Sequence, residues 1–188
     1  MRKLILLMSV SMDGFAGHAD GTLDWLGPDD GPDHGGQRHR INLEALHEVG
    51  LIAMGGGVYP QLRQGWSTSE SPMGRLINTL PKLVFSQSLE RVDWDDATLT
   101  RRPIGDEIPE RKREDGGDIV VFGGPRFAHG LIRERLVDEY RLTVHPVLLG
   151  EGQPLFAGLP EPQRLELVSS TAYTDGAVVQ VLRPLASG

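Results

Sequence analysis

The segment DIVVFGGPRFAHGLIRERLVDEY, residues 118–140, decides the fold class because it joins a buried strand to a helix. The apolar run at 119–122 is typical of a strand covered on both faces, and Pro125 suits the first helical position, where no amide hydrogen is needed. Apolar residues spaced four apart then predict a helix with one apolar face. Gly123 and Gly124 stand at the junction. They permit a tight turn, or they let the backbone approach an anion at the helix start, and the pattern alone leaves both open.

Strands and helices alternate before this segment, and strands follow it. Apolar runs at 3–10, 51–54 and 82–86 predict buried strands, residues 97–100 predict a weaker one, and 101–117 read as a charged surface segment. Helices are expected at 41–50, with Gly50 as the stop, and at 71–80. Residues 139–150 predict a strand, and strands at 163–174 and 177–184 are joined across Asp175 and Gly176, a strong hairpin signal.

This order predicts an α/β fold with a central, mostly parallel sheet flanked by helices and a C-terminal antiparallel hairpin. The 188 residues suit one domain spanning 1–188. A net charge of −7 makes nucleic acid and anionic membranes poor partners, and the absence of cysteine excludes disulfides and thiolate chemistry. Cytoplasmic location is expected, because the apolar start reads as a buried strand, without a cleavage site. No histidine pair has the spacing of a helical metal site, so no metal is predicted.

Glycines gather where three of the predicted strands end, at 14–17, 55–57 and 123–124. Ligands of open α/β sheets bind outside the carboxyl ends of the strands, and the start of a helix adds unpaired amides. The spacing is neither the dinucleotide fingerprint G-x-G-x-x-G nor a P-loop. A standard Rossmann domain is therefore not expected, even if a dinucleotide binds.

The segments LILLMSVSMDGFAG, MGGGVYP, LVFSQSL and residues 118–156 together resemble the dihydrofolate reductase-like superfamily, in the branch of the RibD C-terminal reductase domain. The resemblance covers nearly the whole chain and implies an NADPH-dependent reductase. It implies that the pyrophosphate is held by Gly123, Gly124, Pro125, Arg126 and Phe127. Ser86 and Gln87 would lie near the adenosine, and Ala16 and Gly17 would border the nicotinamide.

One motif departs from the family. The family pattern Gly-Arg-x-Thr-Tyr is replaced here by Gly55, Gly56, Gly57, Val58 and Tyr59. A guanidinium grips phosphate with two hydrogen bonds, and glycine has no side chain to do so. Three outcomes stay open: NADH is used, another residue such as Arg63 or Arg126 substitutes, or nicotinamide binding is lost.

Reduction of a C=N or C=O bond needs a proton donor near the cofactor. Asp13, in the family's S-x-D-G element, and Asp30, a short way after Trp25, are the candidates. Turn-forming or solvated aspartates explain the same positions. Trp25 and Tyr59 are candidate walls for a planar substrate, or anchors in the core.

The main hypothesis is an NAD(P)H-dependent reductase of a small planar heterocycle, such as a pterin or a ribosylaminopyrimidine-like compound. The alternative is a module that binds a nucleotide or flavin-like ligand without turnover, which the loss of the arginine and threonine favours. A homodimer is expected, since proteins of this branch commonly dimerise.

Overall fold

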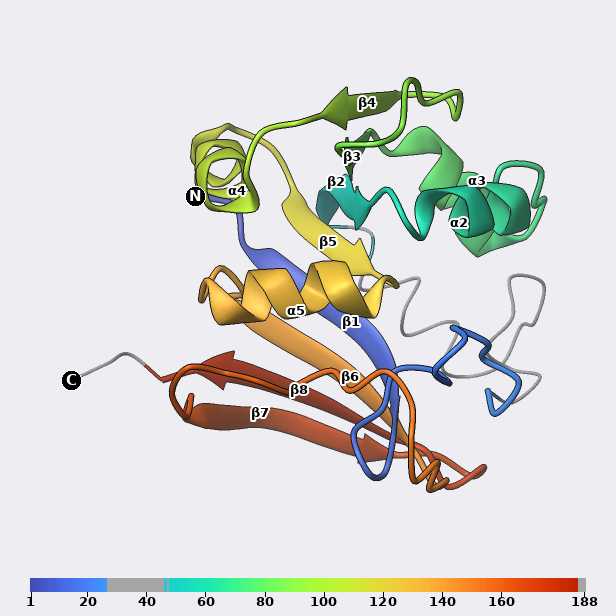
Figure 1. Cartoon of the computed structure of the whole chain (residues 1–188), viewed down its shortest axis with the longest axis vertical. Helices are drawn as coiled ribbons and strands as arrows, with labels where there is room; N and C mark the ends of the chain where they lie inside the picture. Colours follow the sequence, from blue (N-terminus) through green and yellow to red (C-terminus); the bar gives the residue numbers. More distant parts are fainter. Residues whose placement is uncertain (27–45, 47, 186–188) are drawn as a thin grey trace. The chain divides into compact units, whose positions relative to one another are not determined.

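The computed structural model describes residues 1–26, 46 and 48–185, which contain eight strands and four helices (Figure 1). The strands are β1 (Leu4–Ser11), β2 (Val49–Gly55), β3 (Lys82–Phe85), β4 (Ala97–Thr100), β5 (Asp118–Phe122), β6 (Glu139–His145), β7 (Leu165–Ala172) and β8 (Val178–Pro184). The helices are α2 (Tyr59–Trp66), α3 (Pro72–Thr79), α4 (Ile104–Arg113) and α5 (Pro125–Arg133). The strands form one sheet in the order β4-β3-β2-β5-β1-β6-β8-β7. The predicted α/β class, with a mostly parallel sheet and an antiparallel C-terminal hairpin, is confirmed.

The chain forms two compact units. The first holds residues 1–2 and 26–120, and the second holds residues 3–25 and 121–188. The prediction that residues 1–188 make one domain stays a prediction.

In the second unit, β1 and β6 pair in parallel, from Ile5 opposite Glu139 to Ser11 opposite His145. Strand β8 pairs antiparallel with both β6 and β7, which leaves β7 at the end of the strand order. Helix α5 covers one face of β1 and β6 (Figure 1) and buries the apolar face that the sequence predicted, Ala128, Leu131 and Ile132. Helix and sheet thus enclose the core of this unit.

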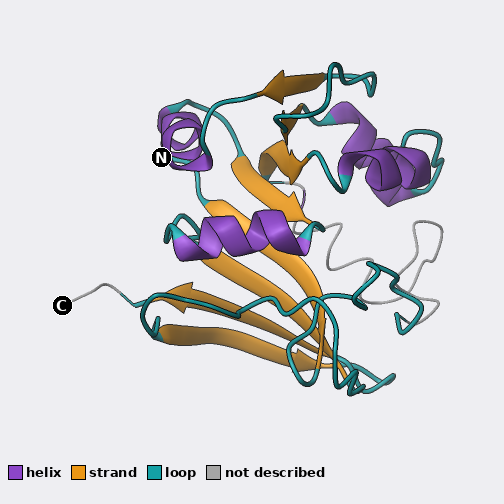
Figure 2. Ribbon diagram, viewed as in Figure 1, coloured by secondary structure: helices purple, strands orange, loops and turns teal. Residues whose placement is uncertain are grey.

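Two predicted elements of this unit end earlier than expected. Helix α5 stops at Arg133, so Leu136 does not extend its apolar face. Arg135 adopts a left-handed backbone conformation with positive φ. The amide of Leu136 bonds the carbonyl of Leu131 at 3.0 Å. This bond and the left-handed conformation of Arg135 together form a Schellman-type helix ending. Strand β6 stops at His145, because Pro146 has no amide hydrogen to extend the ladder. The segment from 146 to 164 has neither helix nor strand (Figure 2).

In the first unit, β2, β3 and β4 pair in parallel. The prediction that Gly50 stops a helix is wrong, because β2 already begins at Val49. A Cβ at Gly50 would lie 2.7 Å from the amide nitrogen of Gly117, so glycine serves a close backbone approach. The rest of the helix predicted for 41–50 lies largely outside the described residues.

Two helices, α2 and α4, were not predicted. Helix α2 follows the glycine run at 55–57 and contains Gly65, so its pattern is weak. Helix α4 lies in the segment read as charged surface, and it keeps Pro109 in its interior. Its charges are not all solvated, since Glu107 is 1% exposed and Ile108 is fully buried. Tertiary packing therefore stabilises a helix that local propensity does not favour.

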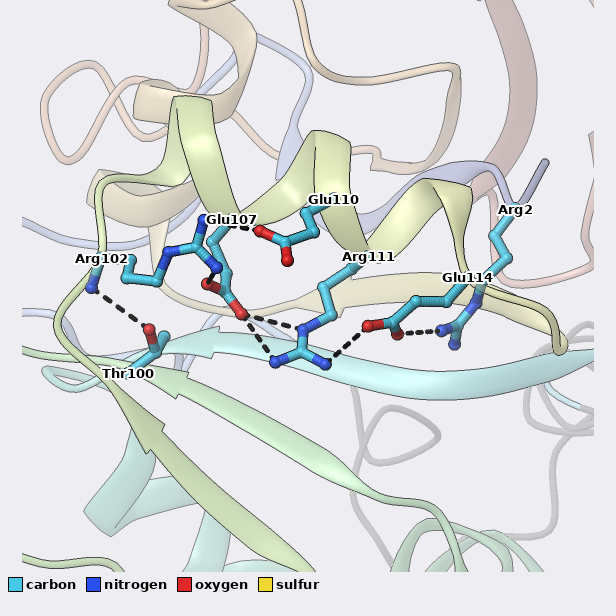
Figure 3. Close-up of polar contacts among 7 residues, drawn as sticks. All are labelled: Arg2, Thr100, Arg102, Glu107, Glu110, Arg111 and Glu114. Atoms are coloured by element: carbon cyan, nitrogen blue, oxygen red, sulfur yellow. Dashed lines mark hydrogen bonds and ion pairs between the residues drawn. The ribbon is translucent and has the colours of Figure 1, made fainter.

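A ladder of alternating charges runs along α4 (Figure 3). The Glu107 carboxylate lies 2.8 Å from Arg111 Nε and 2.8 Å from Arg102 Nη1. Arg111 continues to Glu114 at 2.8 Å, and Glu114 continues to Arg2 at 3.6 Å. Arg2 also donates to the carbonyl of Gly117. Each oxygen of the buried Glu107 carboxylate thus faces an arginine, and this pairing permits its burial.

Replacing Glu107 by Gln should destabilise the protein by about 2–3 kcal/mol, because Arg102 and Arg111 then lose a buried counter-charge. Urea unfolding measures the loss. The matched control is Glu110→Gln on the same helix, since Glu110 pairs with Arg102 at the surface and its side chain is 53% exposed. This control should change stability little. Equal losses in both variants would contradict the role of burial.

A second buried carboxylate, Glu139, is held between two arginines of the second unit. Its Oε1 lies 2.7 Å from Arg141 Nε, and its Oε2 lies 2.9 Å from Arg183 Nη2. Burial by itself raises the pKa of Glu139, but the hydrogen bonds from Arg141 and Arg183 outweigh it and hold the pKa below its ordinary value of 4.5. Glu139 therefore stays ionised and ties β6 to β8.

Because the folded pKa lies below the unfolded one, the stabilisation by Glu139 is complete above about pH 4.5 and is lost as pH falls through the folded pKa. The variant Glu139→Gln should cost about 2 kcal/mol at pH 7, and the gap to wild type should narrow below about pH 4. Urea midpoints across this range test it. A gap that stays constant down to about pH 3 would refute the linkage, and Glu166→Gln, exposed on β7, serves as control.

Candidate functional site

The turn between β5 and α5 is built by two left-handed glycines. Gly123 and Gly124 both have positive φ, in a region that other residues enter only with strain. The carbonyl of Gly124 accepts hydrogen bonds from the amides of Phe127 at 2.9 Å and Ala128 at 3.0 Å. The amide of Arg126, at the second helical position, has no acceptor within the helix, and its side chain is exposed. The glycines are thus needed for geometry, and the same turn presents an amide and a cation to an anion.

The loop after β1 is tied to a second loop after β6. The amide of Ala16 bonds the carbonyl of Gln153 at 2.8 Å, and the amide of Gln153 bonds the carbonyl of Gly17 at 2.8 Å. Ala16 is 5% exposed, so its backbone is firmly held. A Cβ at Gly152 would lie 2.3 Å from the Gly17 carbonyl oxygen, so only glycine fits there.

Asp13 is used within these two loops. Its Oδ1 accepts a hydrogen bond from Ser11 Oγ at 2.6 Å, and its Oδ2 accepts one from the amide of Gly150 at 2.8 Å. The amide of Leu149 lies 3.2 Å from both oxygens. The hydrogen bond from Ser11 and those from the two amides lower the pKa of Asp13. The carboxylate is therefore an anion at neutral pH, and its catalytic role stays a prediction.

Trp25 lies beside the end of β6. Its ring meets that of His145 edge-on, with centroids 5.3 Å apart. His145 is the last residue of β6 and is paired in register with Ser11. Among the described residues, the buried Nε1 of Trp25 has no hydrogen-bond partner. The structure thus places Trp25 beside His145, at the carboxyl ends of the paired strands β1 and β6.

In the first unit, the turn after β2 packs against the turn after β3. The amide of Gly56 bonds the carbonyl of Phe85 at 2.8 Å, and a Cβ at Gly56 would lie 2.6 Å from Ser86 Cβ. Ser86 Oγ accepts hydrogen bonds from the amides of Ser88 at 3.3 Å and Leu89 at 3.1 Å. The space in which a side chain at position 56 would begin is therefore taken by Ser86. Val58 is the N-cap residue of α2.

Gln87 and Tyr59 hold neighbouring segments of the first unit. Gln87 Nε2 donates to the carbonyl of Arg101 at 2.8 Å. Tyr59 is 4% exposed, and its hydroxyl accepts hydrogen bonds from the amides of Asp93 at 2.8 Å and Trp94 at 2.9 Å. These contacts make Tyr59 an anchor of the core, and its role toward a substrate stays a prediction.

The described residues thus group the predicted site by unit. Asp13, Ala16, Gly17 and Trp25 lie together in the second unit, which also holds 123–127. Residues 55–59, 86 and 87 lie in the first unit. Asp30 lies outside the described residues. The described ranges contain no group of three or more acidic or histidine side chains that could hold a metal ion.

The loop that carries Leu149, Gly150 and Gln153 was missed as part of the site. The sequence signal for this loop was the pair Gly150 and Gly152. In the structure both glycines have positive φ. Two glycines so close together after a strand indicate a shaped turn. The sequence did not show which segment this turn faces.

The RibD C-terminal domain family matches residues 2–179. The chain belongs to this family. It is 31% identical to the uncharacterized protein YyaP of Bacillus subtilis strain 168, with 96% of this chain and 94% of YyaP covered. It is 27% identical to YwjB of the same strain, with 96% of both chains covered.

Two solved structures share the fold. A Shewanella sp. PV-4 protein, provisionally named for riboflavin biosynthesis, superposes with a TM-score of 0.76 at 21% identity, covering 97% of this chain and 99% of that one. The Thermotoga maritima diaminohydroxyphosphoribosylaminopyrimidine deaminase/5-amino-6-(5-phosphoribosylamino)uracil reductase superposes with a TM-score of 0.71 at 14% identity. This chain is covered to 98% and spans 57% of that enzyme. At these identities the likeness concerns the fold.

None of the helices that the structure describes is long and apolar enough to cross a bilayer.

The contact between Gly56 and Ser86 can be tested by a double-mutant cycle. Gly56→Ala alone should destabilise the protein by about 1–3 kcal/mol, because the new methyl group overlaps Ser86. Ser86→Gly alone removes the hydroxyl acceptor and should cost less. The double variant should be more stable than Gly56→Ala, which additive effects cannot produce. Thermal unfolding measures all four proteins, and strict additivity would contradict the contact.

Proposed function

We propose that this protein is an NADPH-dependent reductase of a small planar heterocycle, of the pterin or ribosylaminopyrimidine-like class. The observation that carries the proposal is the β5–α5 turn, in which Gly123 and Gly124 open the helix start to an anion. Membership of the RibD C-terminal domain family supports it, and so does the likeness of the fold to a chain named as a uracil-derivative reductase.

The cofactor supplies the hydride, and the protein's residues supply binding and orientation. In the proposal, the amide of Arg126 and its guanidinium bind the pyrophosphate at the start of α5, where the helix dipole favours negative charge. The residues around it, Gly123, Gly124, Pro125 and Phe127, let the backbone come close. Ala16 and Gly17 border the nicotinamide with a backbone already fixed by Gln153.

The proton that completes the reduction needs an acid with an accessible proton. Asp13 fits that task poorly as it stands, because its lowered pKa keeps the carboxylate ionised at neutral pH. Asp30 is therefore the proposed donor, directly or through water, as the family resemblance implies. Trp25 is the proposed wall beside the heterocycle, because its ring lies at the ends of β1 and β6.

The choice between NADPH and NADH depends on the first unit. Gly56 gives no guanidinium to a phosphate, and Ser86 occupies the space beside it. In the proposal, Ser86 and Gln87 contact the adenosine half, while 55–58 offer backbone only. NADH is the second cofactor to test for this reason.

A binding module without turnover is the second candidate function. Gly56 and Val58, in place of the family's arginine and threonine, favour it, since weaker phosphate contacts suit a protein that sequesters another nucleotide or flavin-like ligand. Ligand binding without hydride transfer to any acceptor would distinguish this function from a reductase.

A homodimer in the cytoplasm is also proposed. Strand β7 ends the strand order and exposes Leu167 at 55% and Val168 at 44%. Exposed apolar residues on a terminal strand are consistent with a protein partner. Sedimentation at micromolar concentrations tests for the dimer.

The cofactor proposal is tested by titrating the intrinsic tryptophan fluorescence with NADPH and, separately, with NADH. Arg126→Ala should weaken NADPH binding about tenfold, because a charged hydrogen-bond donor at the phosphate is lost. The control is Arg133→Ala, at the other end of α5, which should leave binding unchanged. Absence of binding of either nucleotide at about 1 mM would overturn the reductase proposal.

A further inference from the structure

Asp13 is the point at which two loops of the second unit meet. The loop of residues 11–17 begins at the last residue of β1, and the loop of residues 146–155 follows β6. Both start at the same edge, because Ser11 and His145 are paired at the ends of parallel strands. Neither loop contains a helix or a strand of its own (Figure 2), so contacts between the two loops have to hold them in place.

Backbone bonds join the loops along their length. Met12 donates to the carbonyl of Val147 at 2.9 Å, Ala16 to Gln153 at 2.8 Å, and Leu155 to Gly14 at 3.0 Å. Between the first two bonds, the 146–155 loop turns through Leu149 and Gly150, whose amides point to no backbone acceptor among the described residues. The Asp13 carboxylate accepts both.

The partners of Asp13 are far away in the sequence, 136 and 137 residues along the chain. A second aspartate in the same region behaves differently. Asp20 accepts hydrogen bonds from the amide of Thr22 at 2.9 Å and its hydroxyl at 2.7 Å, so it stabilises its own turn. Asp13 therefore joins two loops, whereas Asp20 does not. Ser11 Oγ donates to Asp13 Oδ1 at 2.6 Å and so orients the Asp13 carboxylate.

We propose that Asp13 is a positioning residue, which anchors the 146–155 loop to the 11–17 loop and thereby fixes the backbone of Ala16 and Gly17. Its carboxylate already accepts the hydroxyl of Ser11 and two amides, so it acts as an acceptor and holds no proton to donate. Gln153 connects the anchored loop to Ala16 and Gly17, because its backbone forms hydrogen bonds with both residues. The consequence for the nicotinamide rests on the proposed function, whereas the anchor itself does not.

The anchor is tested in the protein without nucleotide, by amide hydrogen exchange and amide chemical shifts measured by NMR. Asp13→Asn keeps the shape but turns one acceptor oxygen into a donor that faces the amide hydrogens. Exchange at Leu149 and Gly150 should accelerate about tenfold or more, and the amide signals of Ala16 and Gly17 should shift. Ser11→Ala, which frees the carboxylate without changing its charge, should accelerate exchange less. Asp20→Asn is the matched control and should leave all four amides unchanged.

Nucleotide titration then tests the link to the site. Asp13→Asn should weaken NADPH and NADH about equally, by about tenfold, and should leave the alkaline limb of the pH–rate profile of kcat, which a proton donor would set, in place. Unchanged exchange at Leu149 and Gly150 would overturn the anchor. Full nucleotide affinity with accelerated exchange would overturn its effect on the site, and loss of the alkaline limb would assign Asp13 to proton donation. If wild type binds no nucleotide, the proposed function fails, and the exchange data still decide whether Asp13 is an anchor.

Discussion

The parallel pairing of β1 with β6 is the constraint on which the second unit depends. These strands lie far apart in the sequence, at Leu4–Ser11 and Glu139–His145, and their register sets Ser11 opposite His145. Because parallel strands end at the same edge, the loops that follow them emerge side by side. Asp13, Gly152 and Gln153 can then interlock the two loops, and Trp25 can meet His145. The candidate site of this unit is a consequence of that register.

Buried charge is handled alike in both units. Glu107 in the first and Glu139 in the second are 1% exposed, and each is flanked by two arginines. A carboxylate buried without such partners would be strongly destabilising, so the arginines are a condition of the fold. The first cluster joins α4 to Arg102, which precedes it, and the second joins β6 to β8. Neither cluster includes a residue proposed to bind the cofactor, so stability and function rest on separate charges.

Glycine has a different task at each junction. At Gly123 and Gly124 it permits a left-handed backbone at the start of α5, and at Gly56 it permits contact with Ser86. The two explanations that the sequence left open at 123–124, a tight turn and an anion site, are compatible, because the conformation that requires glycine also exposes the helix start. At Gly56 the close contact and phosphate binding by a side chain exclude each other, since the contact requires glycine and the family uses an arginine at this position for phosphate. One residue type thus supports the cofactor proposal in one unit and complicates it in the other.

The sequence by itself determined the fold class, the strands with strong apolar runs, the helix after Pro125 and the hairpin at Asp175 and Gly176, because these features depend on local periodicity and turn chemistry. It also singled out the glycine junctions. It did not determine α4, in which the buried carboxylate of Glu107 is paired with Arg102 and Arg111. Nor did it determine the distant contacts of Asp13 and Tyr59, since Tyr59 bonds amides 34 and 35 residues away and Asp13 bonds amides 136 and 137 residues away. Those contacts exist only once strands distant in the chain are paired, and tertiary structure alone decides that pairing.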